Sequence, residues 1–158
     1  MFNMNYYDLE FFKGFTKEEL NLLLKLMVTA SYGQGEKILK EGETSHLLML
    51  IVEGKVKVVK KIDEQTTKVL AILEKGEVFG EMSFFDEGIH NATVIAHSNT
   101  NLLVLSKDDY DILEQKDPKL TIKLLKKIIQ TCSNRIRMLN EEIKQVSNWC
   151  ITLRNKNK

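Results

Sequence analysis

The chain has little proline, little cysteine and almost no excess charge, and each scarcity excludes a class of protein. One proline, Pro118, marks a single boundary, because proline starts a helix well but cannot continue one. Two cysteines, Cys132 and Cys150, are too few for the disulfide framework of a small secreted domain. A net charge of +1 provides no overall field that would attract DNA or an anionic membrane.

Long apolar runs are also missing. No stretch approaches the roughly 20 apolar residues that a membrane-spanning helix requires. Residues 1–5 carry neither the basic region nor the apolar run of a signal peptide. We therefore expect a cytoplasmic protein with no membrane segment. The 43% hydrophobic content over 158 residues is enough for one cored domain, or one domain with an appendage.

The first two-thirds of the chain predict helices followed by a β domain. Residues 1–27 are expected to hold short helices, with Thr16 as the N-cap and Glu19 completing a capping box. From 28 to 106 the hydrophobic period changes to two, and frequent turns suit a sandwich or jelly roll. We expect strands at 37–40, 47–52, 55–60, 69–73, 92–96 and 102–105.

The last third predicts two helices. A short helix over 107–117 follows Ser106, a suitable N-cap. A second helix should begin at Pro118 and run over 118–153, because nothing in that stretch interrupts it. The basic residues at 154–158 read as a solvated tail.

The long helix carries an unbroken heptad repeat. Apolar or small residues alternate steps of three and four at Ile122, Leu125, Ile129, Cys132, Ile136, Leu139, Ile143, Val146, Cys150 and Leu153. This 3.5-residue period, with isoleucine at one core position and mostly leucine or valine at the other, favours a parallel two-stranded coiled coil. We expect a homodimer through the stretch from Ile122 to Leu153, with Cys132 facing its symmetry mate. A single amphipathic helix lying on its own core is the alternative.

A second apolar stripe accompanies the first half of the repeat. It consists of Leu120, Leu124 and Ile128 and stops there. The first half of the helix therefore has one face for its own domain and one for a partner, and the second half has only the partner face.

The segment from 79 to 94 has the chemistry of a small anion site. Gly80 opens a short helical turn, whose free backbone N–H groups attract negative charge. Glu81 inside that turn would repel a phosphate, and so suggests a sugar hydroxyl beside one.

The same segment resembles the phosphate-binding cassette of the cyclic nucleotide-binding domain family, the type found in the catabolite activator protein and the regulatory subunit of cAMP-dependent kinase. That cassette reads F-G-E-[LM]-[AS] and, about ten residues later, R-[AST]-A-[ST]-V. Residues 79–83 read FGEMS and residues 92–94 read ATV. The glycine and valine series at 35–42 and 54–58 matches the barrel of the family. At the position of the family's phosphate-clamping arginine this chain has His90.

The resemblance implies a mainly β fold with flanking helices, namely a β-roll or jelly-roll barrel followed by a long dimerisation helix. It also implies a ligand, cAMP, cGMP or a related anion, and no cofactor. The site residues that it implies are Gly80, Glu81, Met82, Ser83, His90, Asn91, Val58, Leu70 and Ala71.

Each of these residues receives a role from the resemblance. Backbone N–H groups near Met82 and Ser83 would meet the cyclic phosphate, and Glu81 would accept a hydrogen bond from the ribose 2′-hydroxyl. Val58, Leu70 and Ala71 would line the base side. Because histidine is only partly charged near pH 7, His90 predicts weaker binding than an arginine would give, and the Asn91 amide could compensate in part.

Two classes of function stay open, and a third is disfavoured. The chain is either a dimeric sensor of a cyclic nucleotide or a dimeric interaction scaffold with a degenerate nucleotide site. No helix-turn-helix domain follows the long helix, so we expect no DNA binding by the chain itself and an unidentified downstream protein partner. An enzyme on a related β-roll would need three or four metal ligands or a nucleophile–base pair, whereas His46 and His97 stand alone. We therefore expect no catalytic or metal site.

Overall fold

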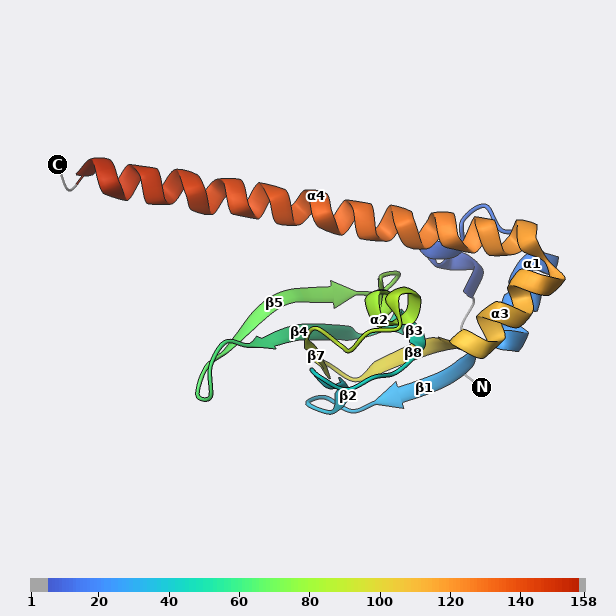
Figure 1. Ribbon diagram of the computed structural model, residues 1–158. Coiled ribbons are helices and arrows are strands. Elements are labelled where there is room, and N and C mark those ends of the chain that lie inside the picture. Colours follow the sequence, from blue (N-terminus) through green and yellow to red (C-terminus); the bar gives the residue numbers. More distant parts are fainter. Residues whose placement is uncertain (1–5, 157–158) are drawn as a thin grey trace.

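The computed structural model describes residues 6–156 and shows two antiparallel sheets with helices at one end (Figure 1). The chain begins with two 3-10 turns, η1 (Tyr6–Asp8) and η2 (Glu10–Phe12), and continues into α1 (Lys17–Leu26). The predicted capping box is confirmed, because the Glu19 N–H donates to Thr16 Oγ1 at 3.2 Å and the Thr16 N–H donates to the Glu19 carboxylate at 2.7 Å.

Eight strands form the two sheets. They are β1 (Val28–Tyr32), β2 (Lys37–Leu39), β3 (Leu47–Glu53), β4 (Lys55–Lys61), β5 (Thr67–Glu74), β6 (Val78–Phe79), β7 (Thr93–Ala96) and β8 (Thr100–Ser106). One sheet has the order β1-β8-β3-β6 and the other β2-β7-β4-β5, with every neighbouring pair antiparallel. The short helix α2 (Glu81–Asp86) lies between β6 and β7. The predicted fold class, a β-roll with flanking helices, is confirmed. Neither β1 nor the two-residue β6 was among the predicted strands.

Two strands are buried on both faces, which explains their unbroken apolar sequences. In β3, Leu48 and Leu50 pack with the helices, whereas Met49 and Ile51 pack with the second sheet. The paired strand β8 divides its side chains in the same way. A strand covered on both sides has no polar face, so the alternation typical of half-exposed strands such as β4 is lost.

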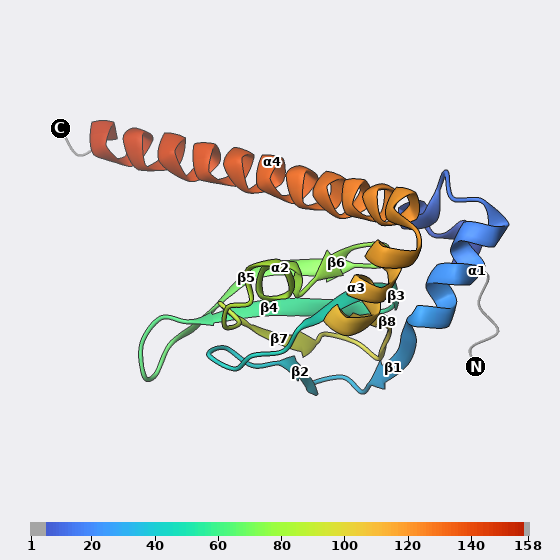
Figure 2. The same ribbon diagram turned by 45° about the vertical axis from the view of Figure 1, so that its right-hand side comes forward.

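Two helices close the domain. The first, α3 (Lys107–Lys116), begins at the predicted cap, where the Asp109 N–H donates to Ser106 Oγ at 3.1 Å. The second, α4 (Pro118–Lys156), runs along one side of the barrel and diverges from it toward the C-terminal end (Figures 1 and 2), and its residues 136–154 are all exposed. The helix continues through residues 154–156, past the predicted end at 153. Residues 1–5 and 157–158, on which parts of the terminal predictions fall, lie outside the described residues.

The stripe that packs on the barrel is as predicted, and eight of the ten heptad residues are exposed, whereas Leu125 and Cys132 are partly buried. Leu120, Leu124 and Ile128 are at most 2% exposed and belong to the core between barrel and helices. The heptad residues turned away from the barrel and classed as exposed are Ile122, Ile129, Ile136, Leu139, Ile143, Val146, Cys150 and Leu153.

Cys132 packs against the core of its own barrel, and this burial raises the pKa of its thiol. Cys132 follows Ile128 by four residues and so continues the stripe that packs on the barrel. The expectation that it also faces a symmetry mate stays a prediction, because a single chain does not test it.

A tight turn between β3 and β4 generates a stability prediction. Gly54 has φ +83°, and a Cβ there would lie 2.2 Å from the backbone oxygen of Asn99. Gly76 has φ +90° with nothing within 4 Å of the same position. Alanine at either position should cost about 1–2 kcal/mol for the left-handed backbone. Gly54→Ala should lose a further ~1–3 kcal/mol because the Asn99 backbone must move.

Urea unfolding of the two variants measures this difference directly. Gly76→Ala is the matched control, since it shares the backbone strain and lacks the clash. Equal losses of unfolding free energy in the two variants would contradict the packing described for Gly54.

Candidate functional site

A glycine allows the predicted cassette to pack directly against the β-roll. Gly80 precedes the first residue of α2 and has φ +81°, and a Cβ on it would lie 2.5 Å from the carbonyl oxygen of Leu47 in β3. No other residue could hold this backbone so close to β3 without displacing it. The first turn of α2, with N–H groups that have no earlier helical partner, is thereby fixed at the edge of the barrel.

A cavity of about 130 Å³ lies behind this turn. It brings together most of the predicted site residues: Val58, Gly80, Glu81, Met82, Ser83, His90 and Asn91. Its remaining lining is apolar except for one arginine: Leu39, Leu73, Phe79, Ala92, Val94 and Arg135. The sequence prediction of a shared site for the 80–83 turn and the 90–91 loop therefore agrees with the geometry.

Two predicted residues do not line this cavity. Ala71 pairs with Val58 across β4 and β5 and is half-buried beside the second core cluster. Leu70 precedes Ala71 in the strand and therefore lies on the opposite face, where it is 44% exposed. Leu73 lines the cavity instead, because it lies on the same face as Ala71 and two residues closer to the cassette end of β5. The base-side role of Leu70 and Ala71 stays a prediction.

His90 is buried and uses both ring nitrogens. It is 6% exposed, with Nε2 2.8 Å from Ser45 Oγ and Nδ1 2.9 Å from Ser83 Oγ. Its backbone N–H donates to the Glu43 carbonyl at 2.8 Å, and its carbonyl accepts from the Gly42 N–H at 2.9 Å. The histidine thus ties the loop between β2 and β3 to the first turn of α2.

Burial also determines the charge of this histidine. Burial lowers the pKa of His90, and the nearby His46 adds to the decrease, while the negative charge of Glu43 opposes it. The ring is therefore neutral at pH 7, with one N–H donor and one acceptor to share between the two serine hydroxyls. It lies at the cassette, as predicted, but without the permanent positive charge of an arginine.

Arg135, from the middle of α4, lines the cavity and was not among the predicted site residues. It is 19% exposed as a side chain, and its Nη1 lies 3.3 Å from Glu81 Oε1. Its Nη2 donates to the carbonyl of Val78 and lies 3.9 Å from Glu77 Oε1. Since Arg135 follows Ile128 by seven residues, two helical turns, its place on the barrel side of α4 was readable from the stripe.

This pairing leaves Glu81 partly available. Its second oxygen, Oε2, has no hydrogen-bond partner within residues 6–156, so it can still accept a bond from a ligand hydroxyl. Arg135 meanwhile neutralises the carboxylate next to the N–H groups of α2. The arrangement suits a ligand that carries both an anionic group and a hydroxyl.

The cavity is small for such a ligand. Its volume of about 130 Å³ lies below the roughly 300–1,000 Å³ of most small-molecule sites.

Metal binding and membrane insertion were considered from the side chains and helices of residues 6–156 alone. No group of three His, Cys, Asp or Glu side chains there could hold a metal ion. Over the same range, none of the helices is both long enough and apolar enough to cross a membrane.

Comparisons with known proteins support the family resemblance that the cassette predicted. The family model described as "Cyclic nucleotide-binding domain" matches residues 29–117. The "Cyclic AMP receptor protein" of Thermus thermophilus is 36% identical over 107 residues, which cover 68% of this chain and 50% of that protein. Human "cGMP-dependent protein kinase 2" is 26% identical over 101 residues, covering 63% of this chain and 13% of the kinase. The chain thus spans at most half the length of these two relatives.

A solved structure extends the likeness to the fold. The crystal structure of a cyclic nucleotide-binding domain from Methylobacillus flagellatus KT has a TM-score of 0.79 and 30% sequence identity. The match covers 85% of this chain and 75% of that one.

The buried neutral His90 generates a prediction about pH and stability. Its folded pKa is lowered, so between the unfolded pKa of about 6.5 and the folded value the unfolded chain binds more protons. The free energy of unfolding should therefore fall as pH decreases below about 6.5, by at most about 1.4 kcal/mol per pH unit, and level off below the folded pKa.

Urea unfolding between pH 7.5 and about 5.5 measures this slope, above the range in which ordinary carboxylates titrate. His90→Gln should remove the contribution, whereas the same change at the exposed His97 should leave it. A slope that persists in His90→Gln would show that another group causes it.

Proposed function

Because this chain belongs to the cyclic nucleotide-binding domain family, we propose that it is a dimeric regulatory module that binds cAMP, cGMP or a related anion in the cassette cavity. The observation that carries the proposal is the convergence of Glu81, the first turn of α2 and an apolar wall on one cavity. Names of relatives refer to both cAMP and cGMP, so they do not favour either base.

The cavity offers a place for each part of such a ligand. The N–H groups of Met82 and Ser83, at the start of α2, would bind the cyclic phosphate. The free oxygen of Glu81 would accept from the ribose 2′-hydroxyl. Val58 and Leu73 would contact the base, which needs apolar surface rather than charge.

We expect the affinity to be lower than in relatives that carry an arginine at position 90. The neutral ring of His90 is already engaged by Ser45 and Ser83. A hydrogen bond to a charged group is worth roughly 1.5–3 kcal/mol, so its loss weakens binding about ten- to a hundredfold.

The dimer in this proposal rests on the exposed heptad face of α4. Ile122, Ile129, Ile136 and Ile143 are each more than half exposed in a single chain. These residues belong to a continuous apolar stripe at 3.5-residue spacing, which the barrel of the same chain does not bury. A second copy of the same helix would bury this stripe.

The alternative is a dimeric scaffold whose nucleotide site has degenerated. The small cavity volume and the occupied His90 favour it specifically, because both reduce what a nucleotide would gain. The two functions share the dimer and differ in the ligand.

Calorimetric titration with cAMP and with cGMP separates these functions. We expect saturable binding of at least one nucleotide, about tenfold weaker in Glu81→Gln because a charge-assisted hydrogen bond is lost. His90→Arg should tighten binding about ten- to a hundredfold.

Glu64→Gln, in the exposed hairpin between β4 and β5, is the control and should bind like the wild type. If neither nucleotide binds, a cAMP or cGMP site is refuted and the scaffold function is favoured. If nucleotide binds but His90→Arg brings no gain in a folded protein, this loop does not face the phosphate.

Light scattering at micromolar concentration measures the dimer. Ile136→Asp combined with Ile143→Asp should give a monomer, because each places a charge at a core position of the coiled coil. Ile151→Asp is the matched control, since Ile151 is 59% exposed but lies off the heptad face. A monomeric mass for the wild type would refute the dimer.

A further inference from the structure

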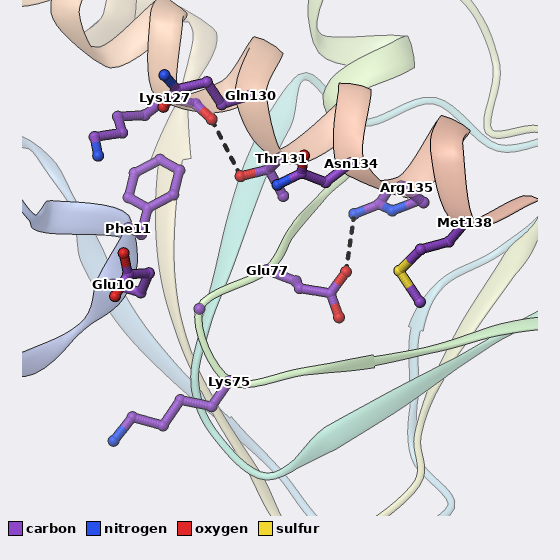
Figure 3. A pocket seen from close by; sticks show the side chains of 11 residues that line it. Glu10, Phe11, Lys75, Glu77, Lys127, Gln130, Thr131, Asn134, Arg135 and Met138 are labelled. Atoms are coloured by element: carbon purple, nitrogen blue, oxygen red, sulfur yellow. Dashed lines mark hydrogen bonds and ion pairs between the residues drawn. The ribbon is translucent and has the colours of Figure 1, made fainter.

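A second and larger cavity lies on the other side of Arg135. It has a volume of about 380 Å³ and is enclosed by η2, the turn between β5 and β6, and the middle of α4 (Figure 3). This volume falls within the roughly 300–1,000 Å³ of small-molecule sites. Arg135 lines both cavities and therefore forms the wall between them.

The charged side chains that line this cavity carry a net positive charge. Its two acidic residues are occupied: Glu10 forms an ion pair with Lys13, and Glu77 accepts the Glu74 N–H at 2.9 Å and lies 3.9 Å from Arg135. Lys75 and Lys127 have no ion pair or hydrogen bond from their ammonium groups within residues 6–156. The cavity can therefore accept an anion without first breaking an ion pair of either lysine.

Arg135 itself has incomplete hydrogen bonding. Its Nε is buried and has no hydrogen-bond partner among the described residues, although Nη1 and Nη2 contact Glu81, Glu77 and Val78. A buried N–H without an acceptor is costly, and such groups are rare in folded proteins. A hydrogen-bond acceptor in the larger cavity would attract the guanidinium. The guanidinium could then rearrange so that its Nε–H donates a hydrogen bond.

The other lining residues suit a small organic molecule. The side chains of Gln130, Thr131 and Asn134 supply an amide, a hydroxyl and a second amide from α4, and Phe11 and Met138 supply apolar surface. Figure 3 shows these side chains arranged around the opening between α4 and the β5–β6 turn. A cavity with apolar walls and a few polar groups is typical of a metabolite site.

We propose that this cavity is a second ligand site for a small metabolite bearing a phosphate or carboxylate group, held by Lys75, Lys127 and Arg135. The coupling of this site to the cassette rests on the proposed function. An anion that attracts the guanidinium removes it from Glu81 and leaves that carboxylate uncompensated beside the cyclic phosphate. The second ligand therefore weakens nucleotide binding, and by linkage the nucleotide weakens binding of the second ligand.

The site is tested first without any nucleotide. Inorganic pyrophosphate and citrate, as phosphate and carboxylate probes, are titrated at constant ionic strength into ¹⁵N-labelled protein. We expect saturable shifts of the amides of residues 75–77 and 127–135 with at least one probe, and the stronger probe identifies the anionic group.

Matched lysine variants make this test decisive. Lys75→Gln and Lys127→Gln should each weaken probe binding about tenfold, whereas Lys126→Gln, at the neighbouring exposed lysine of α4, should not. The proposal is overturned if neither probe gives saturable shifts, if shifts are confined to residues 80–83, or if all three variants bind alike.

The coupling is tested by repeating the cAMP and cGMP titrations at a probe concentration just sufficient to fill most of the wild-type second site. Affinity for the nucleotide should drop several-fold in the wild type and much less in Lys127→Gln, whose weaker second site stays mostly empty at that concentration. An equal drop in the two proteins would show competition at the cassette, and no drop in the wild type would remove the coupling. If no nucleotide binds at all, the proposed function fails while the probe titration still decides the second site.

Discussion

The seating of α4 on the barrel is the contact on which the rest of the structure depends. Leu120, Leu124 and Ile128 bury one face of its first half, which fixes the direction of the whole helix. That direction brings Arg135 against Glu81 and exposes the heptad residues beyond it. The cassette cavity, the second cavity and the proposed dimer face therefore share one rigid element, and a ligand that shifts α4 acts on all three.

The neutral His90 changes how the cassette is held together. An arginine would leave a permanent charge at this position and reach toward an anion. The histidine joins Ser45 to Ser83 instead, and its burial keeps it uncharged near neutral pH. The cation of the cavity then comes from α4, through Arg135, rather than from the cassette loop. In this chain the position of the helix and the charge of the site are linked.

Much of the fold could be predicted from local signals. The Thr16 capping box, the Ser106 cap, the Gly80 turn and the stripe at Leu120 each depend on neighbours close in sequence, and each is found as predicted. What the sequence left out depends on long-range contacts. The packing of Cys132 against the barrel core was not predicted, because this residue belongs to the heptad repeat as well as to the end of the barrel stripe. Leu73 was not among the predicted site residues, yet it lines the cavity, whereas Leu70 and Ala71 do not.

By itself the sequence determined the order of the helices and of most strands, the cassette and the heptad repeat, because periodicity, caps and turns are local properties of a chain. Only the tertiary structure decided the charge and partners of His90, the contact of Arg135 with Glu81, and the existence of two cavities divided by one guanidinium. These features join residues tens of positions apart, as between Ser45 and His90 or Glu81 and Arg135. Burial and pairing of that kind arise only when the packed elements bring distant side chains together, and no local pattern encodes them.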